Sequence, residues 1–360
     1  MKWTIITAIA SFVLSAVAVA MILYIARKKS WYDKIDERKI HTGNIPRLGG
    51  IGFALSFFAV YLFLLIYVKP IPFDFRYIVV FIAMFFILQF GVLDDFKPLQ
   101  PKIKLLFQCI VAISVVISGF VYRRFLLVDF FGITGLSWFR YPLTFIFIVG
   151  ITNAMNFIDG VDGLAGGICA IIAITYSVIL GLFFDNTIAV LLSISLASVI
   201  AGFLIFNLPI PKAKIFMGDG GSQFLGFVLA VLPIINRGNA QLELPLTYAI
   251  ALLIIPIFDT IAAIWRRVRD GRRIDSPDKL HIHHKLMNLG LNARGIIGVL
   301  YTLQIVIGVL VFFSVKIPGK KSLFFLLSAY LIGLGFFTVI HYMNKSVMKN
   351  NAAPVSPEEK

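Results

Sequence analysis

The chain has 360 residues, of which 59% are hydrophobic and 14% are charged, and it carries a formal net charge of +15. Soluble domains have about 25% charged residues, so this composition excludes an ordinary soluble protein. Apolar runs close to the ~20 residues that span a bilayer recur along the whole length. We therefore predict an all-α, polytopic integral membrane protein, built as one helical bundle in contact with the lipid bilayer.

The apolar runs predict eleven transmembrane helices. The first run lacks a small-residue cleavage site, so we interpret it as a retained helix and not as a signal peptide. Residues 1–342 then form a single transmembrane catalytic domain, and residues 343–360 form a cytoplasmic tail that we expect to be disordered. In chain order the spans fall at about 3–26, 49–68, 77–93, 103–121, 141–157, 164–183, 187–206, 221–236, 245–265, 295–316 and 322–342.

Lys and Arg are divided unevenly between the two sets of connections. If the loop after the first span is inside, the inner connections hold 23 of the 33 Lys and Arg residues and the outer ones hold 10. The positive-inside rule then places the N-terminus outside and the C-terminus inside. The positive charge is explained by topology and by attraction to anionic lipid, and we expect no nucleic-acid partner.

Carboxylates gather at the inner ends of the apolar runs. Charges at such depths are costly when unpaired and are usually functional. Because these acids come from distant segments and reach one membrane face, we predict a single site assembled by the bundle. They are Asp94, Asp95, Asp159, Asp162, Asp219 and, partway into the membrane, Asp259.

The stretch NAMNFIDGVDGLAGG, residues 153–167, connects two of these runs. It contains Asn153 and Asn156, then Asp159 and Asp162, among four glycines that predict a break in the helix. Carboxylate and amide oxygens on a broken backbone suit a hard cation such as Mg2+ and the phosphates it holds. The alternative is a polar turn between two helices.

Two other acidic motifs each allow a simple structural interpretation beside the functional one. Asp94 and Asp95 end a span, and adjacent carboxylates either raise one pKa or hold a cation between them. Lys104 could anchor the next span or bind phosphate beside Asp95. Asp219, in the sequence GDGG, could hold a metal against a diphosphate where backbone N–H groups approach an anion, or the glycines could form a simple turn.

The long inner loop at 266–294 is rich in arginine and contains three histidines within four residues. The arginines, including Arg272, could anchor the loop to headgroups. His281, His283 and His284 suit donation to phosphate beside them. Zinc is the alternative, although no Cys is near and the carboxylates favour oxygen chemistry.

Two single residues complete the candidates. Arg47, before Gly49–Gly50, marks either a re-entry turn or a lid over a polar headgroup. Asp259 is placed about 9 Å from Trp265 along a helix of 1.5 Å rise per residue, where we expect it to cap a buried polar contact behind the site.

Five motifs in this order resemble the polyprenyl-phosphate N-acetylhexosamine-1-phosphate transferases. The resemblance runs from about Asp33 to about Asn292 and is strongest to the bacterial enzymes that transfer GlcNAc-1-phosphate. Relatives that transfer a phospho-MurNAc-pentapeptide have three adjacent histidines, whereas Ile282 interrupts the run here. The motifs are PRLGG, GVLDDFKP, NAMNFIDGVDGLAGG, FMGDGGS and HIHH.

The resemblance implies a reaction between UDP-HexNAc and undecaprenyl phosphate. Its products are undecaprenyl-diphospho-HexNAc and UMP, formed at the cytoplasmic face of a bacterial cytoplasmic membrane as the first step of an envelope glycan. It also implies Mg2+, with Mn2+ as the alternative metal, and it leaves open whether the protein is a monomer or a homodimer.

The resemblance also implies roles for individual residues. Asp219, with Asn156, would hold the metal, and Asp94 would orient the lipid phosphate or accept its proton, assisted by Asp95. Lys104 would bind phosphate. The other implied positions hold the nucleotide sugar or groups linked to the metal: Asn153, Asp159, Asp162, His283 and His284, to which we add Arg47, His281 and Arg272 as substrate-binding candidates.

Two rival classes remain at this stage. A CDP-alcohol phosphotransferase also uses DG pairs at a membrane face, but the Ala-Arg that should follow DGVDGLAGG is missing. A secondary transporter would place ion-binding carboxylates near the midplane in repeated halves, whereas these acids lie at one face and no internal repeat is evident.

Overall fold

The computed structural model describes residues 2–32, 45–67, 74–125, 138–236, 239–274, 276, 278 and 280–352, and all of its regular structure there is helical. Eight helices are long and apolar enough to cross a membrane, and a bent pair forms a ninth candidate span. The helices are α1 (Lys2–Lys28), α2 (Gly49–Tyr67), α3 (Phe75–Phe96), α4 (Pro101–Ile117), α6 (Arg140–Ile158), α7 (Leu164–Phe183), α8 (Thr187–Asn207), α9 (Gly218–Val231), α10 (Leu246–Leu252), α11 (Ile254–Arg269), α12 (Ile282–Asn288), α13 (Ala293–Lys316) and α14 (Lys320–Ala352).

Each of the eleven predicted spans corresponds to one helix or to the bent pair. This confirms the all-α, multi-pass architecture. Helices α4, with 17 residues, and α9, with 14, are short for a full crossing, so the number of spans and their orientation stay predictions. Helix α14 continues past the expected end at residue 342 as far as Ala352, and residues 353–360 of the predicted tail lie outside the described residues.

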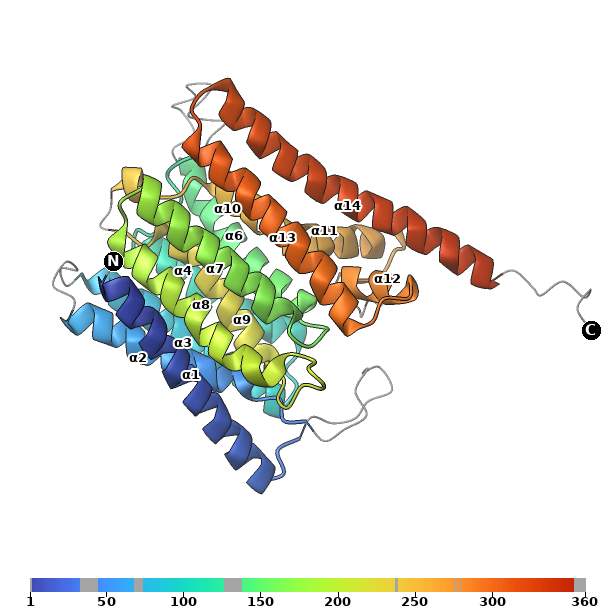
Figure 1. The fold of residues 1–360 in the computed structure, drawn as a ribbon, viewed down its shortest axis with the longest axis horizontal. Coiled ribbons are helices and arrows are strands. Elements are labelled where there is room, and N and C mark those ends of the chain that lie inside the picture. Colours follow the sequence, from blue (N-terminus) through green and yellow to red (C-terminus); the bar gives the residue numbers. More distant parts are fainter. Residues whose placement is uncertain are drawn as a thin grey trace, which may run out of the picture.

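Helix α9 is the centre of the bundle. It packs against α2, α3, α6 and α7, and Figure 1 shows it enclosed by these helices. Every residue of α9 except Asp219 is buried. Helix α9 is therefore enclosed by its neighbours, and its polar side chains are all in the first two turns.

Glycines allow the neighbouring helices to approach the N-terminus of α9. A Cβ added to Gly91 of α3 would lie 2.3 Å from the Cα of Gly220, and one added to Gly50 of α2 would lie 2.4 Å from the Cα of Gly221. Small residues are how membrane helices bring their backbones together. Gly220 and Gly221 of the GDGG motif thus serve close helix packing.

The predicted span at 245–265 is wrong in one respect, because the helix is broken. Helices α10 and α11 meet at Leu253 with a bend of 53°. Pro256 has no N–H to donate to the carbonyl of Leu252. The Nε2 of Gln304, on α13, donates to that carbonyl instead at 3.0 Å. A buried side chain thus satisfies the backbone group that the break leaves free.

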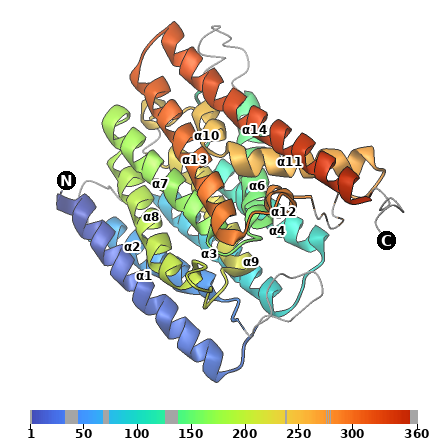
Figure 2. The same ribbon diagram turned by 45° about the vertical axis from the view of Figure 1, so that its right-hand side comes forward.

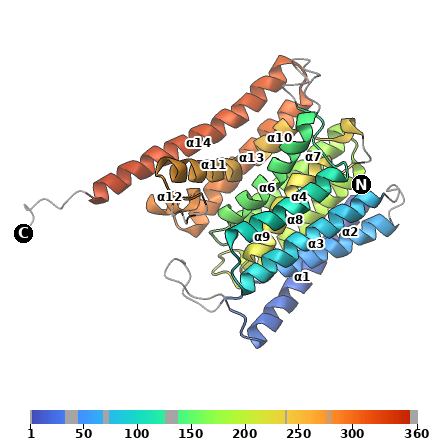
Figure 3. The same cartoon turned by 180° about the vertical axis from the view of Figure 1, so that it is seen from behind.

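Helices α11, α12 and α14 form one side of the molecule. Helix α14 packs on α11, α12 and α13, and Figures 2 and 3 show these helices at one edge, with the C-terminal part of α14 extending away from the main bundle. The Nδ2 of Asn288 donates to the Oδ1 of Asn344 at 3.0 Å and joins α12 to α14.

We predict that Gly91→Ala lowers the melting temperature of the detergent-solubilised protein by several degrees. The added methyl must displace the backbone of Gly220, and overpacking of this kind costs about 1–3 kcal/mol. The matched control is Gly150→Ala on exposed α6 surface, where nothing lies within 4 Å of the added carbon. Equal melting temperatures for the two variants would contradict the close packing of α3 on α9.

Candidate active site

A cluster of carboxylates and cations surrounds the N-terminus of α9. The Nη2 of Arg47 lies 2.6 Å from Asp219 Oδ1, and its Nε lies 3.4 Å from Asp95 Oδ1. Lys104 forms an ion pair with Asp94 and its Nζ lies 3.5 Å from Asp219 Oδ2. Asp219 is therefore shared by two cations from distant parts of the chain. The structure thus brings together three of the predicted acids with Arg47 and Lys104, two of the predicted basic ligands.

Asp95 caps α9 from the end of α3. Its Oδ1 accepts the N–H of Asp219 at 2.8 Å and its Oδ2 accepts the N–H of Gly220 at 3.1 Å. The first N–H groups of a helix have no partner within it, and its dipole favours a negative charge there. The anion that the GDGG backbone binds is the Asp95 carboxylate. This arrangement fixes Asp219 beside Asp94.

Two of the motifs are held together by their backbones. The N–H of Phe216 donates to the carbonyl of Pro46 at 2.8 Å, and the N–H groups of Gly49 and Gly50 donate to the carbonyls of Phe216 and Met217 at 2.9 and 2.8 Å. PRLGG therefore lies directly against FMGDGG. This pairing places the side chain of Arg47 over Asp219.

The stretch at 153–167 is a helix break, as predicted. Helix α6 ends at Ile158 and α7 begins at Leu164, after Gly163 with a φ of 79°. Burial raises the pKa of Asp159 to about 7, and the charge of Arg47 opposes this rise, while Asp219 and Asp162 add to it. Asp159 therefore lies in the same electrostatic site as Asp219.

Asn156 is on the last turn of α6 and faces α9. Its Nδ2 donates to Ser222 Oγ at 2.9 Å, and its side chain is also a hydrogen-bond partner of the Asp219 carboxylate. Asn156 therefore lies close to Asp219, and the role of the two residues in holding a metal stays a prediction. Asn153 lies one turn earlier and its Nδ2 donates to Gln108 and to the Val149 carbonyl, at 2.6 and 2.8 Å. Its amide nitrogen is thus used inside the bundle.

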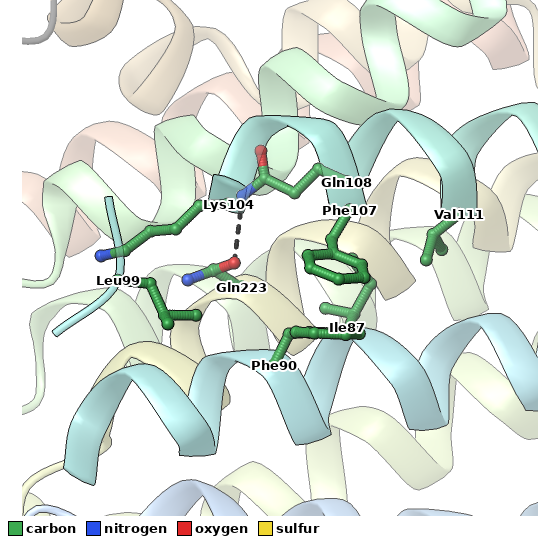
Figure 4. Close-up of a pocket in the computed structure, with 8 residues that line it drawn as sticks. All are labelled: Ile87, Phe90, Leu99, Lys104, Phe107, Gln108, Val111 and Gln223. Atoms are coloured by element: carbon green, nitrogen blue, oxygen red, sulfur yellow. Dashed lines mark hydrogen bonds between the residues drawn. The ribbon is translucent and has the colours of Figure 1, made fainter. Parts of the chain in front are cut away.

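A buried chain of amides beneath the site was not anticipated from the sequence. Gln108 of α4 donates from Nε2 to the Oε1 of Gln223 on α9 at 3.0 Å, and accepts from Asn153. Figure 4 shows this pair beside Lys104, around a remaining space of about 10 Å³. Gln108 lies four residues after Lys104, and therefore one turn further along the same helix face. The four-residue spacing of these two polar residues in the sequence could have indicated a polar face on α4.

Asn207 and Tyr301 hold the turn of the 153–167 stretch, and the sequence analysis missed both. Asn207 accepts the N–H of Gly163 at 2.8 Å through Oδ1 and donates from Nδ2 to the carbonyl of Ile215 at 2.9 Å. The hydroxyl of Tyr301 donates to the carbonyl of Gly163. Asn207 thereby ties this turn to the segment that leads into GDGG.

The HIHH segment is anchored by Asp259. The Oδ2 of Asp259 lies 2.7 Å from His281 Nδ1, and its Oδ1 accepts the N–H of Ile282 at 2.7 Å. Asp259 is thus the cap of α12, and the polar contact expected behind the site exists. Because a carboxylate can only accept, Nδ1 of His281 carries a proton. The His281 ring packs 5.8 Å from that of Phe157, which places HIHH against the end of α6.

His283 is the histidine that meets the acidic stretch. Its ring fills the space over Gly160, where a Cβ would lie 2.3 Å from Nε2. Burial, aided by the charge of His284, lowers the pKa of His283 to about 3, so the ring is neutral at pH 7. Its Nδ1 is buried and has no hydrogen-bond partner among the described residues. A ligand with a hydrogen-bonding oxygen would satisfy it.

Some predicted residues are not joined to the cluster by the contacts that the structure describes. The Nη2 of Arg272 pairs with Asp270 at 3.1 Å in an exposed turn. The ring of His284 packs against that of His283 at a tilt of 43°, with ring centroids 4.3 Å apart. The charge of Asp162 contributes to the raised pKa of Asp159. The roles predicted for these three residues stay predictions.

The donor set suits a hard divalent cation. It consists of carboxylates and one amide, the ligands that Mg2+ prefers. Within the described parts of the chain, no three of the His, Cys, Asp and Glu side chains are already arranged around a common metal position. The positive charges among the carboxylates are those of Arg47 and Lys104. A metal would thus require these side chains to change partners.

Comparison with known proteins agrees with this fold and site. Residues 77–237 match the model of glycosyl transferase family 4. The chain is 34% identical, over 90% of its length and 88% of the relative, to the probable undecaprenyl-phosphate N-acetylglucosaminyl 1-phosphate transferase of Bacillus subtilis (strain 168). It is 31% identical to the undecaprenyl-phosphate alpha-N-acetylglucosaminyl 1-phosphate transferase of Escherichia coli (strain K12), over 86% of this chain and 84% of the relative.

A third relative accepts a different lipid by its name. It is the decaprenyl-phosphate N-acetylglucosaminephosphotransferase of Mycobacterium tuberculosis (strain ATCC 25618 / H37Rv), 33% identical over 74% of this chain and 71% of the relative. The fold and the site define a multi-pass membrane phosphotransferase. The chain belongs to the polyprenyl-phosphate N-acetylglucosamine phosphotransferases of glycosyl transferase family 4. This membership decides against the transporter.

We predict that Asp259→Asn lowers phosphotransferase activity at least tenfold without unfolding the protein. An amide donates where the carboxylate accepted, so it reverses the tautomer of His281. The measurement is a double-mutant cycle with His281→Gln. We expect the double variant to be no less active than the less active of the two single variants. The melting temperatures of all three variants should lie within a few degrees of the wild-type value. Fully additive losses would show that the two residues act separately.

Proposed function

We propose that this protein transfers GlcNAc-1-phosphate from UDP-GlcNAc to undecaprenyl phosphate. The products are undecaprenyl-diphospho-GlcNAc and UMP, and the reaction takes place at the cytoplasmic face of a bacterial cytoplasmic membrane as the first step of a lipid-linked glycan. The observation that carries the proposal is the cluster of Asp94, Asp219, Arg47 and Lys104 around the α9 N-terminus, in a chain similar to enzymes named for this transfer over most of its length.

The chemistry needs positioning and charge neutralisation more than a strong base. A phosphate monoester has a second pKa near 6 and is largely dianionic at pH 7. One of its oxygens forms a bond to the β-phosphorus of UDP-GlcNAc, while the bond from that phosphorus to the bridging oxygen breaks and UMP leaves. Arg47 and Lys104 are placed to bind the phosphate oxygens as negative charge redistributes.

Mg2+, with Mn2+ as the alternative, is the cofactor that we assign to this site. Asp219 and Asn156 would hold it, and when bound it would neutralise diphosphate charge and polarise the phosphorus centre. Arg47, which now pairs with Asp219, would then be released towards phosphate, while Lys104 keeps its ion pair with Asp94. His283, in the tautomer that carries its proton on the buried Nδ1, would donate to an oxygen of the nucleotide-sugar phosphates.

The pairing of the carboxylates favours direct attack over a covalent aspartyl intermediate. The Oδ1 of Asp94 accepts the N–H of Leu99 at 2.7 Å, and its Oδ2 pairs with Lys104. Both oxygens of Asp95 accept N–H groups of α9. Lone pairs in strong hydrogen bonds are poorly available as nucleophiles. We assign Asp94 to positioning Lys104 and the lipid phosphate, and Asp95 to positioning Asp219.

We predict that the purified protein releases UMP from UDP-GlcNAc only when undecaprenyl phosphate and a divalent cation are both present. Each component is omitted in turn, and UMP and the lipid product are both quantified. Release with a different UDP-HexNAc but not with UDP-GlcNAc would overturn the assigned sugar. Absence of release with every nucleotide sugar tested would overturn the proposed reaction.

We predict that Asp219→Asn lowers UMP release at least about a hundredfold, the loss typical when a group that stabilises a phosphoryl transition state is removed. The backbone N–H of residue 219 remains available to Asp95, so the melting temperature should change by only a few degrees. Asp270→Asn, in an exposed turn, is the matched control and should retain full activity. Near-normal cation-dependent turnover in Asp219→Asn would refute the metal assignment.

A further inference from the structure

A cavity of about 450 Å³ is lined by residues of α11, α12 and α14. Its wall along the helices is apolar and includes Phe258, Ile261, Trp265, Leu334 and Phe337. Ile261, Trp265 and Leu334 are each more than half exposed, so the groove is open sideways. In a membrane protein, such a side opening faces lipid.

The inner end of the groove is positively charged. Arg266, Arg269 and Lys285 line it, and none of the lining residues that the structure describes is acidic. Arg266 pairs with Asp278 at 2.6 Å. Arg269 shares the single carboxylate of Asp270 with Arg272. The groove therefore retains positive charge after its ion pairs are formed.

Lys285 is the residue that points to a ligand. It is 3% exposed and lines the cavity. It makes no side-chain hydrogen bond and no ion pair with any residue that the structure describes. A buried ammonium without an anion is costly. Burial, together with the charge of Arg266, lowers the pKa of Lys285, while the charges of Asp259 and Asp278 oppose this shift without forming an ion pair with it.

The dimensions match one lipid chain and its headgroup. Phe258 and Arg269 are eleven residues apart on α11, which is about 16 Å at 1.5 Å per residue. That is close to the ~15 Å depth of one leaflet's hydrocarbon. Trp265 and Tyr342 are exposed near the basic end, as aromatic residues are at a membrane interface.

We propose that this groove binds an anionic membrane phospholipid, whose phosphate pairs with Lys285 and Arg269 and whose acyl chain lies along α11 and α14. The charge complementarity selects an anionic headgroup, and the apolar wall selects a lipid over a free anion. The site is distinct from the carboxylate cluster, because Asp94, Asp95, Asp219, Arg47 and Lys104 are not among the described residues that line the groove.

Lys285 also connects this site to the HIHH segment. It lies on the seven-residue helix α12, which carries His283 and is capped by Asp259. His283 and Lys285 are two positions apart and point to opposite sides of a helix. A phosphate on Lys285 would therefore hold α12 from the side away from Gly160.

The test is native mass spectrometry of the full chain in detergent, with added phosphatidylglycerol or phosphatidylcholine of identical acyl chains. We expect one tightly retained phosphatidylglycerol, and about tenfold weaker retention in Lys285→Met, which keeps the length of the side chain. Lys97→Met, at the end of α3, is the matched control and should bind as the wild type does. Equal retention in all three proteins would overturn the proposal.

A second pair of variants keeps the proposal testable if Lys285→Met does not fold. Thr338 lines the groove from α14 and is exposed. Thr338→Glu should weaken phosphatidylglycerol retention, and Thr338→Gln should not. Displacement of the bound lipid by glycerol phosphate alone would overturn the lipid assignment in favour of a simple anion site. Retention of undecaprenyl phosphate in place of phosphatidylglycerol, lost in Lys285→Met, would assign the groove to the acceptor and overturn the proposal.

Discussion

The contact between the Asp95 carboxylate and the first N–H groups of α9 is the constraint on which the rest of the site depends. Helix α9 is buried on all sides, so the N–H groups of its first turn cannot form hydrogen bonds with water. A carboxylate supplies two charge-assisted hydrogen bonds there, each of which contributes about 1.5–3 kcal/mol. The same bonds fix the direction of Asp219, and Arg47 and Lys104 then gather on it.

The same physical solution appears a second time at α12. Asp259, from the other side of the bundle, accepts the first N–H of that short helix and also holds His281. In both places a carboxylate on one long helix caps the N-terminus of a shorter one. The hydrogen bonds of such a cap offset the free-energy cost of a charge at membrane depth. They also fix the orientation of the residues that follow. The acidic and histidine motifs are thus positioned independently and meet where His283 covers Gly160.

The electrostatics of the site are matched to phosphate ligands. Each of Asp94, Asp95 and Asp219 has a basic side chain within 4 Å, so the cluster is stable without leaving bare negative charge in the bundle. The basic side chains are partly exposed, whereas the side chains of Asp94 and Asp95 are almost fully buried. Arg47 and Lys104 therefore form the exposed part of the cluster, and the buried carboxylates hold these two cations in place.

The sequence by itself determined the class of protein, the helix positions and most of the acidic residues of the site. The length of an apolar run determines whether that segment can span the bilayer. Asp94, Asp159 and Asp219 could be recognised because charges at the ends of such segments are costly and are usually functional. Pro256 was also a readable sign of the break between α10 and α11.

Only the tertiary structure decided what each group contacts, because hydrogen bonds between distant helices have no local pattern in the sequence. It showed that the glycines of GDGG serve helix packing and that Asp95 is the anion at their N–H groups. It revealed Asn207 and the Gln108–Gln223 pair. Lys285, which reads as one more positive charge of an inner loop, becomes notable only because folding buries it in a groove beside α11 and α14 without a partner among the described residues.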